Sequence, residues 1–196
     1  MARITPIEQP VSANMQTAFE SVGKLLGFVP NSLRIMQLRP GIVEALAKLL
    51  AACWAPDSLV DGGFKRLIAY MSSHAAGCQY CVAHQVAGAL LLNIDERKMA
   101  AIWDYETSPL YTARERVALD YARAGSLVPN EVTDAMFEKL KAHWSDAEIV
   151  EITGVVGAFG FLNRFNDSLA TPLEPQAIGK ANDILGRERW SPGKHA

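Results

Sequence analysis

Apolar side chains recur every three or four residues along most of this chain, the spacing of one face of an α-helix. In the first such segment the apolar stripe consists of Met15, Phe19, Val22 and Leu26. No six-residue run combines apolar–polar alternation with β-branched side chains, the pattern typical of a strand. The pattern therefore predicts an all-α protein.

Capping residues and prolines mark the ends of the expected helices. Thr112 with Glu115, and Ser145 with Glu148, have the spacing of a capping box. Asn31 follows a proline and is expected to cap a short helix at its N-terminus. We expect helices over residues 14–26, 31–40, 41–55, 61–77, 78–92, 95–103, 112–125, 133–144 and 145–169.

The chain from residue 172 onward lacks this regularity. Three prolines and three glycines interrupt it, and only residues 176–185 offer a turn or two of helix. We therefore predict one helical domain over residues 1–171, with its core at about residues 57–169. An extended C-terminal arm or partner-binding segment is expected over residues 172–196.

Composition narrows the classes of protein that fit. Hydrophobic residues make up 49% and charged residues 20% of the 196 positions, as in a folded globular protein. A net charge of −2 argues against broad nucleic-acid binding. No run reaches the roughly 20 apolar residues of a membrane span, and residues 1–14 lack the apolar stretch of a signal peptide. The three cysteines form no secreted disulfide pattern, so we expect a cytoplasmic protein.

The segment with the clearest chemistry is Cys78-Gln79-Tyr80-Cys81-Val82-Ala83-His84. On a helix, Cys78 and Cys81 lie one turn apart on the same face, so a disulfide can form and reopen with little backbone movement. Cys78 stands at the expected helix start, where unpaired N–H groups stabilise a thiolate. His84 lies three residues beyond Cys81, where its imidazole can take the thiol proton.

Three arrangements fit this cluster. Both cysteines can pack as inert core residues, or they can bind zinc together with His84 and His74. Structural zinc sites usually draw on two separated ligand pairs, and the chain has no second pair. The helix-start position and His84 favour the third arrangement, thiol redox chemistry. We expect neither a cofactor nor a resident metal.

Several further side chains are weaker candidates for this site. Tyr80 can hydrogen-bond a bound peroxide, although a packed ring with its hydroxyl at the surface is the commoner arrangement. His74 can reach the thiols from the preceding helix end, or simply lie near the C-terminus of that helix. Asn163, Asn166 and Asp167 end the longest helix. They can line a pocket between subunits, but we expect them to be capping or surface groups.

The Gly-Cys-Gln-Tyr-Cys motif at residues 77–81, followed one turn later by a histidine, resembles the alkylhydroperoxidase-D-like (AhpD-like) proteins of the carboxymuconolactone decarboxylase superfamily. The resemblance spans about residues 25–169. It implies an AhpD-like helical bundle that assembles into dimers, trimers or hexamers. It also implies a peroxidase in which Cys81 attacks the hydroperoxide, Cys78 resolves the sulfenic acid to a disulfide, and a dithiol or lipoyl-type reductant reopens it.

Two positions depart from the family pattern. The family histidine usually follows the second cysteine by four residues, where this chain has Gln85. The family often carries a proton-transferring Glu twelve residues before the first cysteine, and this chain has Arg66 there. A guanidinium cannot act as a base at neutral pH, although it can lower a thiol pKa or face solvent.

Two alternatives to the peroxidase therefore stay open. One is a protein with the family fold that senses redox state or binds a ligand without catalysis. The other is a metal site at the Cys/His cluster.

Overall fold

The computed structural model describes residues 2–196, and its regular structure is entirely helical in that range. The α-helices are α1 (Ala13–Leu26), α2 (Asn31–Met36), α3 (Pro40–Cys53), α4 (Gly62–Ala75), α5 (Gln79–Leu91), α6 (Glu96–Ala100), α7 (Ala113–Gly125), α8 (Asp134–Lys141), α9 (Asp146–Leu169) and α10 (Pro175–Leu185). Two short 3-10 helices are η1 (Ala101–Asp104) and η2 (Gly193–His195). The all-α prediction is confirmed.

Most of the expected helix starts are formed by the residues that mark them in the sequence. Thr112 and Ser145 each make a complete capping box, on α7 and α9. The prediction for Asn31 is wrong, because Pro30 holds the capping position, and the first N–H groups of α2, those of Asn31 and Ser32, donate instead to the side chains of Glu174 and Tyr80. The Asn31 amide instead donates to the carbonyl oxygen of Pro172 at 3.0 Å. This side chain therefore holds the C-terminal segment rather than its own helix.

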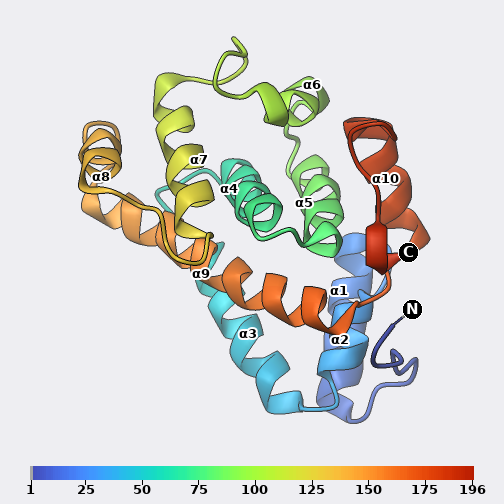
Figure 1. Cartoon of the computed structure of the whole chain (residues 1–196). Coiled ribbons are helices and arrows are strands. Elements are labelled where there is room, and N and C mark those ends of the chain that lie inside the picture. Colours follow the sequence, from blue (N-terminus) through green and yellow to red (C-terminus); the bar gives the residue numbers. More distant parts are fainter. Residues whose placement is uncertain (1) are drawn as a thin grey trace.

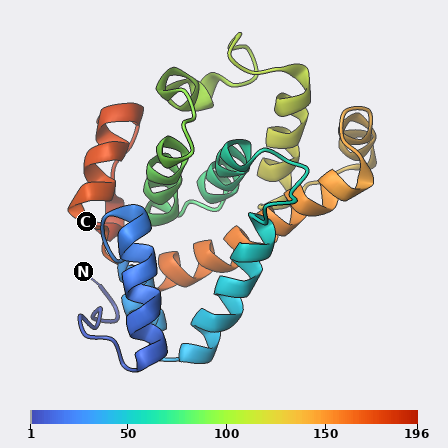
Figure 2. The ribbon, with the colours of Figure 1, turned by 180° about the vertical axis from the view of Figure 1, so that it is seen from behind.

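Helix α4 lies at the centre of the molecule, packed against α5, α7 and α9 (Figure 1). The long α9 crosses the molecule from α8 to the region of α1 and α2. In the view from behind, α1, α2 and α3 lie together at one end, with α3 against α9 and α1 against α5 (Figure 2). Within residues 2–196, no helix combines the length and apolar character of a membrane span.

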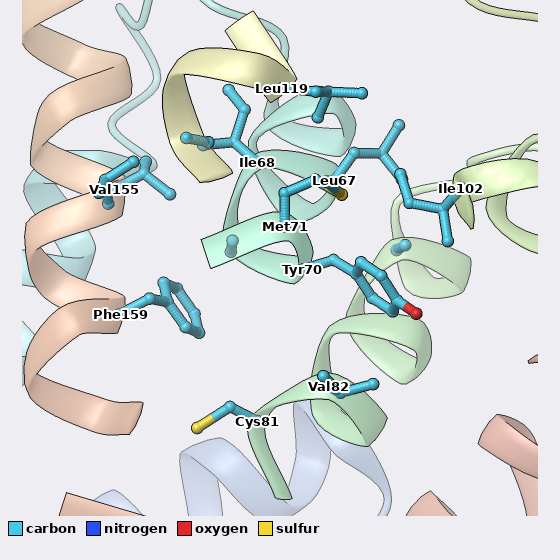
Figure 3. Close-up of a cluster of buried hydrophobic side chains, with 14 of the residues drawn as sticks. Leu67, Ile68, Tyr70, Met71, Cys81, Val82, Ile102, Leu119, Val155 and Phe159 are labelled. Atoms are coloured by element: carbon cyan, nitrogen blue, oxygen red, sulfur yellow. The ribbon is translucent and has the colours of Figure 1, made fainter. Parts of the chain in front are cut away.

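The core is built around the side chains of α4. Leu67, Ile68 and Tyr70 are completely buried, because α4 has neighbours on several sides. Figure 3 shows them among side chains of α5, α7 and α9, with Cys81 at the edge of the cluster and its sulfur directed toward the side of α9. The cysteine site thus lies at the boundary between the core and the layer formed by α1–α3.

The segment from residue 172 onward differs from the expected extended arm. Residues 175–185 form the eleven-residue helix α10, which packs on α5 and α6. Pro175 occupies the first turn of α10, where a missing N–H costs nothing, so this proline starts a helix rather than interrupting one. Ala177, Ala181 and Leu185 share one buried face. The segment closes back on itself through a 2.7 Å bond from the Leu173 N–H to the His195 carbonyl oxygen.

Candidate active site

A tight turn between α4 and α5 delivers the first cysteine. Gly77 has φ +74°, in the left-handed region where a side chain is unfavourable. Cys78 then takes the capping position of α5, as the sequence predicts, and its sulfur accepts a hydrogen bond from the Cys81 N–H at 3.4 Å. The two sulfurs therefore lie on the same first turn of α5.

Cys81 borders a cavity of about 430 Å³, whereas Cys78 does not. Helices α1, α2 and α3 line one side of this cavity, and α4, α5 and α9 line the other. Most of the lining side chains are apolar. The polar ones are Ser32, Arg66, His84, Gln85 and Asn166. A small molecule in the cavity can therefore reach the sulfur of Cys81, while the sulfur of Cys78 lies behind it.

The acidity of Cys81 is set by four surrounding features. Burial raises the pKa of the Cys81 thiol well above its ordinary value, and the hydrogen bond and charge of Cys78 raise it further. Asp167 acts in the same direction, while the Asn166 amide lowers the pKa by donating to the sulfur at 3.5 Å. Cys81 therefore rests as a thiol at neutral pH, and a base is needed to ionise it.

His84 points to a partner far along the chain. Its Nε2 lies 2.8 Å from Glu174 Oε2, and its ring stacks on that of Tyr80 with 4.4 Å between centroids. Glu174 Oε1 accepts from the Tyr80 hydroxyl at 2.9 Å and also from the Asn31 N–H. Tyr80 is therefore neither at the surface nor on the cavity wall, and its hydroxyl holds the carboxylate that orients His84.

Glu174 is the carboxylate beside His84, and it was not identified from the sequence. Burial alone would raise the pKa of Glu174, but the hydrogen bond and charge of His84 and the Asn31 N–H outweigh it and hold the pKa below its usual range. Glu174 is thus an anion beside the imidazole, as the absent family glutamate would be. The sequence carries one signal of it, because Glu174 is the only charged residue between Asp167 and Lys180.

Arg66 and Gln85, at the two departures from the family pattern, meet inside the cavity. The Arg66 Nη1 donates to Gln85 Oε1 at 3.3 Å, and the guanidinium lies 4.6 Å from the centroid of the Trp54 ring. Arg66 is half-buried in the cavity wall and is not among the causes of the pKa shift of Cys81. Its charge is directed to the cavity rather than to the thiols.

His74 is not brought to the site. Its ring packs edge-on against Trp103, with 4.1 Å between centroids. Burial, followed by the charge of Arg123, lowers the pKa of His74. Across residues 2–196, no three His, Cys, Asp or Glu side chains are grouped so that they could hold a metal ion. The four-ligand zinc arrangement is therefore not formed.

The expectation that the end of α9 is a polar surface is wrong for two residues. Asn163 and Asn166 are 1% exposed. The end of α9 lies beneath α1 and α2 rather than in solvent, so an amide that would cap a free helix contacts the sulfur of Cys81 instead. Within the described chain, His84 makes no direct hydrogen bond to either sulfur, and both Cys81 and His84 face the same cavity.

The sequence is similar to a known protein family and to a protein from Escherichia coli. Residues 40–124 match the carboxymuconolactone decarboxylase family. The protein named uncharacterized protein YnjA, from Escherichia coli (strain K12), is 29% identical over 117 residues. That match covers 60% of this chain and 64% of YnjA, so the chain spans less than two thirds of this curated relative.

Solved structures resemble the whole fold. The debrominase Bmp8 is 29% identical with a TM-score of 0.85, over 92% of this chain and 97% of Bmp8. A cysteine-to-alanine variant of Bmp8 has been solved in complex with 2,3,4-tribromopyrrole. An uncharacterized peroxidase-related protein from Silicibacter sp. TM1040 is 25% identical with a TM-score of 0.80, over 91% of this chain and 94% of that one. The family match over residues 40–124 and the fold shared with these proteins support the AhpD-like carboxymuconolactone decarboxylase superfamily.

Proposed function

We propose that this protein is a thiol-dependent peroxidase that reduces organic hydroperoxides through Cys81 and Cys78. The observation that carries the proposal is the position of the two sulfurs. Cys81 borders the cavity, and Cys78 lies one turn away behind it, within the same hydrogen-bonded turn. This arrangement separates an attacking thiol from a resolving thiol.

The reaction balances on these groups. Cys81 gives its proton to His84, and the thiolate attacks the outer oxygen of the hydroperoxide, so that the O–O bond breaks and Cys81 becomes a sulfenic acid. The leaving alkoxide takes a proton from His84 and departs as an alcohol. The Cys78 thiol then attacks the Cys81 sulfur, so that the S–O bond breaks and the disulfide forms. The departing hydroxide takes the proton that Cys78 gives up and leaves as water. An external dithiol, of the lipoyl type or smaller, reduces the disulfide.

Glu174 supports the proton transfer through His84. Its carboxylate, 2.8 Å from Nε2, stabilises the imidazolium that forms when Cys81 loses its proton. The glutamate expected on α4 is absent, and in this proposal the C-terminal segment supplies the acid instead.

The test is turnover of cumene hydroperoxide with a small dithiol. Wild type should consume peroxide, and Cys81→Ser should not. Cys78→Ser should stop after one turnover and leave a Cys81 sulfenic acid that dimedone traps. Cys53→Ser is the matched control, because Cys53 does not border the cavity, and it should retain turnover. Equal slow rates in wild type and Cys81→Ser would exclude the peroxidase and favour a protein that binds or senses without catalysis.

A second candidate function is reductive debromination of an aromatic ring. It is favoured by the similarity to Bmp8 and by a cavity that is mostly apolar and far larger than a peroxide group needs. The ring carbon gains a proton, the Cys81 thiolate takes the bromine, and Cys78 displaces bromide to form the same disulfide. Bromide release from a polybrominated pyrrole, measured with the same dithiol and the same variants, distinguishes the two reactions.

A further inference from the structure

The cavity wall contains a cation, Arg66, with an unsatisfied hydrogen-bond donor. Arg66 projects from α4 into the cavity wall, and one of its nitrogens donates to Gln85 at 3.3 Å. The Arg66 Nε is buried and has no hydrogen-bond partner. The face of the guanidinium is covered by Trp54, which contributes a cation–π contact but accepts no hydrogen bond.

No carboxylate in residues 2–196 balances this charge. Burial alone lowers the pKa of Arg66 to about 10, and no acidic neighbour opposes the shift. The neighbouring Lys65 is completely buried but has a counter-ion, since its ammonium lies 2.7 Å from the carboxylate of Glu151. A partly desolvated cation without a counter-ion is costly, so an anion that enters the cavity gains by pairing with Arg66.

The position of Arg66 relative to Cys81 is fixed by α5. A Cβ atom added at Gly88 would lie 3.1 Å from the Arg66 Cζ, so the guanidinium rests directly against the backbone of α5 at this glycine. Cys81 and Gly88 are seven residues apart on this helix. At 1.5 Å per residue, the contact at Gly88 lies about 10 Å along the helix axis from Cys81, and Gln85, which accepts from the guanidinium, lies about 6 Å from it.

We propose that the cavity binds a monoanionic organic molecule with an apolar body, whose charge pairs with Arg66 and whose reacting group lies at Cys81, about 6–10 Å away along α5. The apolar side chains of α1 and α3 cover the body of this molecule. The identity of the reacting group rests on the proposed function, so for a peroxidase the substrate is the hydroperoxide of a medium-chain or aromatic acid. The binding of the anion does not depend on catalysis.

Binding is tested by calorimetric titration of the reduced full-length protein at pH 7.5 with octanoate and with octanamide, which has the same shape and no charge. Wild type should bind octanoate about tenfold or more tightly, because hydrogen bonds to charged groups are worth that ratio. Arg66→Gln should remove the preference, and Arg66→Lys should restore part of it. Arg187→Gln changes an exposed arginine outside the cavity and should leave it intact.

The outcomes separate this inference from the proposed function. Equal binding of octanoate and octanamide by wild type, or binding of neither, overturns the inference. This result does not depend on whether any variant folds. A preference that persists in Arg66→Gln overturns the role of Arg66. Peroxide turnover by wild type and Cys81→Ser is measured separately from octanoate binding. A wild type that has no peroxide turnover but prefers octanoate would contradict the peroxidase and support the anion site.

Discussion

At the scale of single residues, the reactivity of Cys81 depends on opposed influences on one sulfur. Burial and Cys78 favour the thiol, and the Asn166 N–H favours the thiolate. Because the thiol form is favoured at rest, the reaction must create the thiolate when a substrate is present. A neighbouring base is then more useful than a permanently ionised cysteine, and His84 with Glu174 is placed for that task.

Replacing Asn166 with leucine should slow alkylation of Cys81. The variant loses the only hydrogen bond that favours the thiolate in the resting site, and a bond to a charged acceptor is worth about 1.5 kcal/mol or more. We expect about a tenfold lower rate with iodoacetamide at pH 8, read by peptide mass mapping. Asn163→Leu is the control, since Asn163 is equally buried on α9 and makes no bond to Cys81. Equal slowing in both variants would assign the effect to packing.

Glu174 adds a pH dependence to stability. Its pKa in the folded protein lies below the ordinary value, so the folded state favours the carboxylate. The stabilisation is therefore complete above the ordinary carboxyl range, about pH 4.3, and is lost as the pH falls through the lower folded value. Glu174→Gln should lower the free energy of unfolding at pH 7 by about 1–3 kcal/mol, and the difference from wild type should shrink below about pH 4. Urea unfolding at several pH values measures it, and a constant difference from pH 7 to pH 3 would contradict this role.

At the scale of elements, the turn between α4 and α5 decides where the cysteines lie. Gly77 allows the chain to reverse within one residue, so that Cys78 caps α5 and Cys81 follows on its first turn. A side chain at Gly77 would meet nothing within 4 Å, so its cost is purely that of the left-handed backbone.

Gly77→Ala should therefore destabilise the protein by about 1–2 kcal/mol, and Gly77→Asn by less, since asparagine tolerates this conformation better. Gly179→Ala makes the same chemical change inside α10, where a Cβ atom also meets nothing within 4 Å, and should stabilise by about 0.5–1 kcal/mol. The opposite signs, measured by urea unfolding, test the backbone explanation. Two losses of similar size would show that side-chain space, not φ, limits both positions.

The elements also show why the fold was predictable and part of the site was not. Helix starts depend on residues within one turn, so the capping boxes at Thr112 and Ser145 could be identified from neighbours alone. The pair of His84 with Glu174 joins residues 90 positions apart, and the contact of Asn166 with Cys81 joins residues 85 apart. Such contacts depend on how helices pack, and no local spacing encodes them.

At the scale of the whole molecule, one buried cation joins three helices and a loop. The Lys65 ammonium on α4 donates to the carbonyl oxygen of Cys53 at the end of α3, and it pairs with Glu151 on α9. Glu151 also accepts from the N–H groups of Leu59 and Val60 in the loop between α3 and α4. This network holds α3, on one side of the cavity, to α4 and α9 on the other side. Its loss should therefore destabilise the whole fold.

Removing the charge of Glu151 should be costly because it leaves the ammonium of Lys65 buried and unpaired. We expect Glu151→Gln to lower the free energy of unfolding by about 3 kcal/mol, measured in urea so that ionic screening stays constant. The double variant Lys65→Met/Glu151→Gln removes both charges and should recover part of this loss, since a buried apolar side chain replaces an unpaired ion. Glu188→Gln, at an exposed position, is the control and should change stability by less than about 0.5 kcal/mol. If the double variant recovers none of the loss seen in Glu151→Gln, the pair is not coupled, and α3, α4 and α9 are held together by apolar packing alone.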